Sequence, residues 1–159
     1  MATPVPPLPN PLRRALVTGG SGDIGGAICR QLALDGVHVV VHANGNRDRA
    51  EAVADAIRAD GGSAEAVAFD VADAGAARAA IDALLQGGSL QIVVNNAGIH
   101  DDAPMAGMTD AQWKRVIDVS LHGFFHVTQP LLLPMARARW GRIVNVSSVA
   151  AVLGNRGQV

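Results

Sequence analysis

Residues 14–25, RALVTGGSGDIG, decide the fold of this chain. The apolar residues 15–17 predict a short buried strand, and the glycines that follow Thr18 predict a tight turn. Over residues 24–34 apolar side chains recur at helical spacing, and Gly36 is expected to end this helix. A strand, a glycine-rich turn and a helix in this order predict the opening of a βαβ unit.

The same alternation of apolar runs and alanine-rich helical stretches continues along the chain. Strands are predicted at residues 37–41, 64–69, 90–94 and 143–146, and helices at 48–59, 73–85 and 111–139. Apolar runs with little polar alternation are typical of parallel strands covered on both faces. The sequence therefore predicts an α/β fold with a Rossmann-type doubly wound parallel sheet. Pro130 and Pro134 are expected to kink or divide the last helix, because proline lacks the N–H that a helix needs.

Composition narrows the function classes. The 159 residues are 49% hydrophobic and 17% charged, which predicts one folded domain, 13–159, behind a proline-rich irregular arm, 1–12. A net charge of −1 argues against a broad nucleic-acid-binding surface. The single cysteine, Cys29, excludes an internal disulfide and a cysteine-based zinc site. Because no secretory or membrane-spanning apolar run is found, the expected location is the cytoplasm.

The turn from Thr18 to Gly25 has the chemistry of a phosphate site. Glycines let the backbone approach a pyrophosphate closely, and the following helix begins with unpaired N–H groups. An acidic residue usually ends the second strand when the ligand is NAD, yet no acidic residue stands between the second strand and Asp48 here. Arg47 is positioned to meet a 2′-phosphate, which favours NADPH. The alternative is that Arg47 and Arg49 only form a solvated helix start.

Two further motifs accompany this turn: Asn95-Asn96-Ala97-Gly98 after the fourth strand, and the fifth strand ending at Ser147-Ser148. In order and spacing the three motifs resemble the short-chain dehydrogenase/reductase family over residues 14–159. Within it, the chain is most similar to bacterial 3-oxoacyl-[acyl-carrier-protein] reductases. The resemblance implies strand order 3-2-1-4-5 with later strands missing. It also implies NADPH-dependent reduction of carrier-bound or other 3-oxoacyl thioesters, and a homo-oligomer when the chain is complete.

The resemblance also implies roles for individual residues. Ser148 matches the catalytic serine that hydrogen-bonds the substrate carbonyl, and Arg139 matches a position that docks the acidic carrier protein. Compensation of a helix dipole explains Arg139 equally well. The implied cofactor-binding residues are Thr18, Gly19, Gly20, Ser21, Gly22, Ile24, Gly25, Asn44, Arg47, Asp70, Val71, Asn96, Ala97 and Gly98.

The chain departs from the family pattern at several positions. Relatives often have arginine at the position of Gly22 and usually have glycine at the position of Asp23. Asp23 is expected to cap the helix rather than face the phosphates. Ser120 replaces the usual catalytic asparagine, whose role through its main chain can survive the change. The sequence contains no tyrosine, so these 159 residues lack the catalytic Tyr-x-x-x-Lys motif of the family. In relatives that motif would follow just beyond the position of Val159. The chain is therefore interpreted as the front portion of a reductase, inactive as it stands.

Two other functions stay open at this stage. One is a truncated module that binds a nucleotide or a partner without turnover, and the other is a short-chain reductase of a different carbonyl substrate. A metal site at His122 and His126, spaced like some zinc ligands, is rejected because no third ligand is evident.

Overall fold

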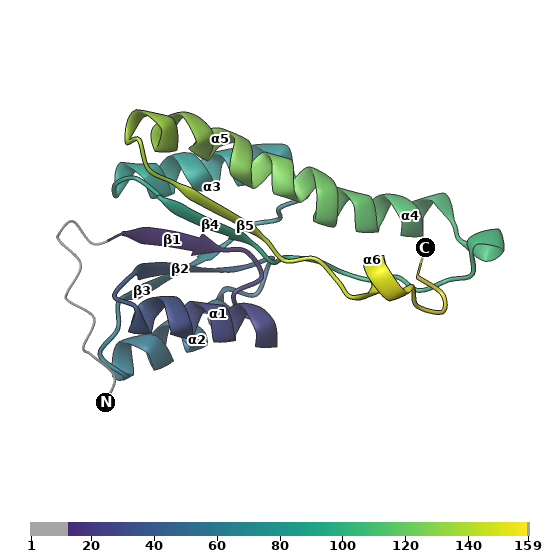
Figure 1. Ribbon diagram of the computed structural model, residues 1–159, viewed down its shortest axis with the longest axis horizontal. Coiled ribbons are helices and arrows are strands. Elements are labelled where there is room, and N and C mark those ends of the chain that lie inside the picture. The colour runs from purple at the N-terminus through teal and green to yellow at the C-terminus, as the bar shows by residue number, and fades with distance from the viewer. Residues whose placement is uncertain (1–12, 159) are drawn as a thin grey trace.

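The protein is described by a computed structural model over residues 13–158, so the predicted arm at residues 1–12 lies outside the described part. Its centre is a parallel five-stranded sheet in the order β3-β2-β1-β4-β5, which confirms the predicted α/β fold and strand order (Figure 1). The strands are β1 (Arg14–Val17), β2 (His38–Ala43), β3 (Ala64–Ala68), β4 (Ile92–Asn95) and β5 (Arg142–Asn145).

Helices cover both faces of the sheet. In Figure 1, α1 and α2 lie below it, and α3 and α5 lie above. The helices are α1 (Asp23–Leu34), α2 (Arg47–Ala59), α3 (Ala74–Gln86), α4 (Asp110–Ile117), α5 (Gly123–Arg137) and α6 (Ala150–Leu153), with a 3₁₀ turn η1 (Met105–Gly107) and a π-helical segment η2 (Asp118–His122).

The core divides into two clusters because successive strand residues point to opposite faces. Leu16 packs with α3 and α5 residues such as Ile81 and Leu131. The next residue, Val17, packs with α1 and α2 residues such as Cys29 and Ile57. All six of these side chains are buried. Burial on both faces explains why β1 and β2 read as continuous apolar runs. The apolar residues of β5, at the edge of the sheet, are instead exposed.

Helix starts follow capping chemistry. Thr109 caps α4 through a capping box with Gln112, and Asp73 caps α3 by accepting hydrogen bonds from two backbone N–H groups. The expectation that Asp23 caps α1 is wrong. Gly22 is the N-cap residue and makes no side-chain bond, whereas Asp23 is exposed in the first turn. There its carboxylate still interacts favourably with the helix dipole.

The expected interruption of the long helix occurs at a different place. Pro130 and Pro134 both lie inside α5, which runs through them without a break. Val127, Leu131 and Met135 are buried along α5, and this packing offsets the hydrogen bonds that the prolines remove. The change in helical geometry instead falls upstream, at η2.

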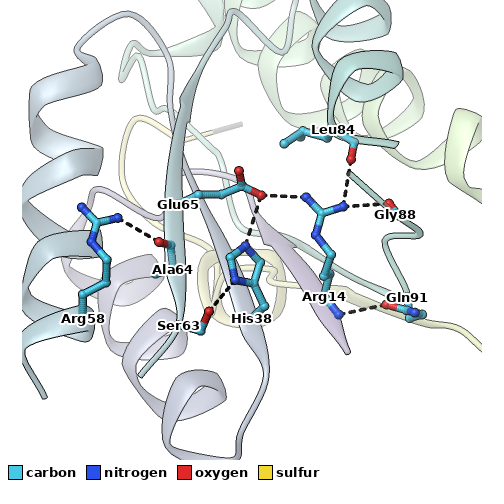
Figure 2. Close-up of polar contacts among 9 residues, drawn as sticks. All are labelled: Arg14, His38, Arg58, Ser63, Ala64, Glu65, Leu84, Gly88 and Gln91. Carbon is cyan, nitrogen blue, oxygen red and sulfur yellow. Dashed lines mark hydrogen bonds and ion pairs between the residues drawn. The ribbon is translucent and has the colours of Figure 1, made fainter. Parts of the chain in front are cut away.

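A polar network ties the amino ends of three neighbouring strands together (Figure 2). The Arg14 guanidinium on β1 donates to Glu65 Oε1 on β3 at 2.7 Å, and to the carbonyls of Leu84 and Gly88 at 2.8 and 2.7 Å. His38 on β2 pairs with the same Glu65 oxygen at 3.2 Å. This network lies at the end of the sheet opposite to the strand ends that bear the predicted site.

Candidate functional site at the carboxyl edge of the sheet

A cavity of about 990 Å³ opens where β1, β4 and β5 end. In parallel α/β sheets, ligands bind in the crevice outside the carboxyl ends of the strands. Many of the predicted site residues line this cavity: Thr18, Ile24, Val71, Asn96, Ala97, Gly98, Ser120 and Ser148. Asn44 and Asp70 line an adjoining hollow of about 480 Å³, and Ile99 and Val119 border both spaces. The three motifs therefore meet at one edge.

The glycine turn is shaped by two positions that tolerate no side chain. Gly19 has φ +64°, and a Cβ there would lie 3.0 Å from Asn96 Nδ2. A Cβ on Gly25 would lie only 2.2 Å from the Gly19 carbonyl oxygen. The first turn of α1 is thus pressed against the loop that precedes it, so the helix begins directly at the cavity.

Three backbone N–H groups have no helical partner at this helix start. The first intrahelical bond of α1 runs from the Gly26 N–H to the Gly22 carbonyl at 2.7 Å. The N–H groups of Asp23, Ile24 and Gly25 precede it and have no partner within the helix. With the helix dipole, these three groups can hold an anion such as a phosphate.

Thr18 joins the glycine turn to the motif after β4. Its Oγ1 accepts hydrogen bonds from the N–H groups of Asn96 and Ala97, both at 3.0 Å. The Asn96 side chain in turn donates to the carbonyls of Thr18 at 3.0 Å and Gly19 at 3.3 Å. These hydrogen bonds join residues about 78 positions apart in the sequence, and Thr18, Asn96 and Ala97 all line the cavity.

Sequence reasoning missed His42, which accepts hydrogen bonds from two N–H groups of the glycine turn. His42 is 1% exposed at the end of β2. Its Nδ1 accepts from the Gly19 N–H at 3.1 Å, and its backbone oxygen accepts from the Ser21 N–H at 3.3 Å. A histidine that ends an apolar β-branched run is the sequence signal that could have drawn attention to it.

The structure separates the two arginines considered for a 2′-phosphate. Arg47, the predicted one, and Arg49 are both exposed at the start of α2, and neither lines either cavity. Arg49 reaches the glycine turn, where its guanidinium donates to the Ser21 carbonyl at 3.4 Å. The reason is helical geometry. Asn46 caps α2, and two residues that lie two positions apart on a helix, such as Arg47 and Arg49, point to different sides of it.

The two serines also line this cavity. Ser148 is exposed, and its Oγ accepts from the Ala150 N–H at 3.1 Å. Because the hydroxyl is the acceptor in this bond, its own proton is available for a second acceptor. Ser120 lies on η2 and is one of the residues that line the cavity. The Asn95 amide joins β4 to α5 and β5 by donating to Thr128 Oγ1 and Asn145 Oδ1, both at 2.9 Å.

Other titratable groups have structural partners. His122 pairs with Asp118 at 2.8 Å, and His126 Nδ1 lies 3.0 Å from the Val71 carbonyl. In residues 13–158 no three His, Cys, Asp or Glu side chains gather as a metal ion would need. Burial raises the pKa of Cys29 to about 12, so its thiol is neutral. Within the same residues, no helix combines the length and apolar character needed to cross a membrane.

The fold and this edge define a Rossmann-type domain with a glycine-rich turn at its topological switch point. The family model for short chain dehydrogenases matches residues 13–159. The chain belongs to the short-chain dehydrogenase family.

Individual relatives agree with this assignment. The chain is 43% identical over 147 residues to a 3-oxoacyl-[acyl-carrier-protein] reductase of Staphylococcus aureus, and 42% identical over 147 residues to an acetoacetyl-CoA reductase of Cupriavidus necator. Each match covers 92% of this chain and 60% of the relative. The crystal structure of a gluconate 5-dehydrogenase from Burkholderia cenocepacia, in complex with NADP and tartrate, is similar with a TM-score of 0.86 at 35% identity. That match covers 92% of this chain and 58% of the neighbour, so the chain spans about 60% of the length of these proteins.

Proposed function

We propose that this chain binds NADPH along the carboxyl edge of its sheet. The observation that carries the proposal is that Thr18 and Ile24 of the glycine turn, residues 96–98 and Ser148 line one cavity. The unpaired N–H groups of Asp23, Ile24 and Gly25 would hold the pyrophosphate. The nicotinamide ribose would lie beside Asn96, Ala97 and Gly98. The solved neighbour that was crystallised with NADP supports this choice of ligand.

The preference for NADPH over NADH rests on the hollow beside the second strand. Asn44 and Asp70 line this hollow, where the adenosine would lie, with Asp70 and Val71 flanking the adenine. Asp70 Oδ1 already accepts from the Ala72 N–H at 2.9 Å, so its carboxylate stabilises the turn after β3. At the end of β2 the chain has Asn44 rather than a carboxylate. Arg49, already at the glycine turn, supplies a positive charge for a 2′-phosphate.

The reaction we propose is the reduction of a 3-oxoacyl thioester. Bound NADPH supplies the hydride. As the carbonyl carbon accepts that hydride, negative charge develops on the carbonyl oxygen. The Ser148 O–H, which has no acceptor of its own among residues 13–158, would stabilise this charge by donating a hydrogen bond to the oxygen. Ser120 on η2 would hold a relay water through its main chain. The names of the two reductase relatives, which act on acyl-carrier-protein and CoA thioesters, support this substrate class.

The proton that completes the alcohol must come from a general acid, which contributes about 10²–10⁴-fold to such reactions. The 159 residues contain no tyrosine. We therefore propose that they bind the cofactor without measurable turnover. Docking of an acidic carrier protein at Arg139, assembly into a dimer or tetramer, and a cytoplasmic location belong to the same hypothesis and stay predictions.

Two measurements test the proposal. Calorimetric titration of the 159-residue chain should show tighter binding of NADPH than of NADH, and tighter binding of NADH would refute the preference. A chimera that continues into the remaining part of the Staphylococcus aureus reductase should reduce acetoacetyl thioesters with NADPH, and Ser148→Ala should lower that activity sharply. Full activity of the Ser148→Ala chimera would remove Ser148 from catalysis.

A second function is favoured by one observation. Because the sequence contains no tyrosine, a binding module without any reductase activity accounts for the same cavity. The chimera separates the two functions, since a module whose site has lost its chemistry gives an inactive chimera that still binds NADPH.

A further inference from the structure

His42 connects two turns that belong to different parts of the cofactor site. Its side chain, 99% buried, lies between the glycine turn after β1 and the end of β3. Nδ1 accepts from the Gly19 N–H at 3.1 Å, and Nε2 lies 2.8 Å from the Phe69 carbonyl oxygen. The Phe69 ring packs against the imidazole, with ring centroids 4.3 Å apart. Phe69 directly precedes Asp70, which borders the proposed adenosine hollow.

The two partners fix the protonation state of this imidazole. A backbone N–H can only donate and a carbonyl can only accept, so Nδ1 must carry a lone pair and Nε2 must carry the proton. Both bonds are therefore made only by the neutral Nε2–H tautomer. Burial lowers the pKa of His42, although the Phe69 bond and the charge of Asp70 partly oppose this effect. The imidazole is accordingly neutral near neutral pH.

The bond to Gly19 carries particular weight because of where that residue stands. Gly19 has φ +64° and lies against Asn96 and Ala97, so its peptide plane sets how the loop leads into α1. Without an acceptor, its N–H would be a donor without a partner below the turn, which costs free energy. Rotation of this peptide would relieve that cost and would also displace the N–H groups that face the phosphates.

We propose that His42 is a positioning residue for dinucleotide binding, which acts by clamping the Gly19 N–H to the end of β3. This inference rests on the proposed cofactor site. His42 does not touch the dinucleotide in this arrangement. It fixes the position of the phosphate-binding turn relative to the turn before Asp70. The first turn would contact the phosphates and the second the adenosine, so both contacts can form at the same time.

A purely space-filling role for His42 predicts a different outcome, and two amide substitutions distinguish the roles. His42→Asn places an oxygen where Nδ1 lies and keeps the acceptor for Gly19, but it leaves the larger void. His42→Gln reaches towards the Nε2 position, keeps the donor for Phe69 and fills more volume, but loses the acceptor for Gly19. A space-filling residue is replaced better by glutamine, whereas a clamp on Gly19 is replaced better by asparagine.

The experiment compares wild type, His42→Asn, His42→Gln and His42→Phe by NADPH titration and by hydrogen exchange of the Gly19 amide. We expect His42→Asn to bind within roughly threefold of wild type and His42→Gln and His42→Phe to bind roughly tenfold more weakly, the size of one hydrogen bond. Gly19 amide protection, measured without cofactor, should persist in His42→Asn and fall in the other two. Thermal melts establish that the compared variants are folded.

Each outcome bears on the proposal. Equal NADPH affinity among the folded variants, or tighter binding by His42→Gln than by His42→Asn, overturns it. If His42→Phe does not fold, the two amide variants decide; if His42→Asn alone fails to fold, packing dominates and the clamp is refuted. Absence of NADPH binding by wild type instead removes the proposed function, and the clamp with it, whatever the variants do.

Discussion

Replacing Gly25 by alanine should break the glycine turn, and the structure gives the size of the effect. The new Cβ would lie 2.2 Å from the Gly19 carbonyl oxygen and 2.7 Å from Asn96 Nδ2. An ordinary contact begins at 3.4 Å, so the first gap must widen by 3.4 − 2.2 = 1.2 Å. The first obstacle is backbone, and the second is an amide already bonded to Thr18 and Gly19. Neither can rotate away.

The expected cost combines three terms. Overpacking of this kind costs about 1–3 kcal/mol, and the steric overlap at Gly25 places it at the upper end. Loss of one Asn96 bond adds about 1 kcal/mol, while the better helix propensity of alanine returns at most about 1 kcal/mol. We therefore expect Gly25→Ala to lower the free energy of unfolding by about 3 kcal/mol and to abolish NADPH binding.

A matched control is the next residue in the same helix. A Cβ on Gly26 would meet the Gly20 carbonyl oxygen at 3.4 Å, an ordinary contact. Gly26→Ala should therefore be neutral or stabilising by up to about 1 kcal/mol. Urea unfolding and NADPH titration of both variants provide the comparison. If Gly25→Ala is as stable as Gly26→Ala and binds NADPH as well, the close approach of α1 to the turn is not what shapes this site.

Three further predictions follow from contacts at the two ends of the sheet. Gly19→Val should abolish NADPH binding in calorimetry while the chain still melts cooperatively, because valine is strained at φ +64°; unchanged affinity would place the phosphate site elsewhere. Thr18→Val should cost about 1–3 kcal/mol in urea unfolding by removing the acceptor for two N–H groups, whereas Thr18→Ser should restore most of it. At the far end, burial raises the pKa of Glu65, but hydrogen bonds from Arg14 and His38 outweigh this effect and lower it overall. A carboxylate with a lowered folded pKa stabilises the protein above its unfolded pKa and loses that contribution as the pH falls through the folded value. The stability advantage of wild type over Glu65→Gln should therefore hold above the ordinary glutamate pKa of 4.5 and shrink as the pH falls below it, and an advantage that is constant with pH would contradict the ion pair.

Local patterns were enough to predict the sheet and most helices. Apolar runs such as Val39–Val41 reflect burial on two faces, and that burial requires no knowledge of distant residues. The caps at Asp73 and Thr109 are equally local, because capping depends on residues two or three positions away. For the same reason, the glycine turn could be located from its place between a strand and a helix.

Features set by distant contacts could not be predicted from the sequence. The role of His42 depends on Gly19 and Phe69, which lie 23 and 27 positions away. The choice between Arg47 and Arg49 depends on how α2 is rotated relative to the glycine turn. The passage of α5 through Pro130 and Pro134 depends on packing against other elements, which overrides the local preference.

The position of β1 in the middle of the sheet also dictates an order of events during folding. β1 pairs with β2, which follows it closely, and with β4, whose residues lie about 77 positions later. Loop closure favours the near partner, so β1, β2 and β3 should assemble with α1 and α2 before β4 joins. Until α3 and α5 arrive, the opposite face, which includes Leu16 and Val40, stays uncovered. As the chain emerges from a ribosome, this half-covered sheet is the species most prone to aggregate. Pulse-labelled hydrogen exchange should therefore show α1 and α2 protected before α5, and simultaneous protection would refute this order.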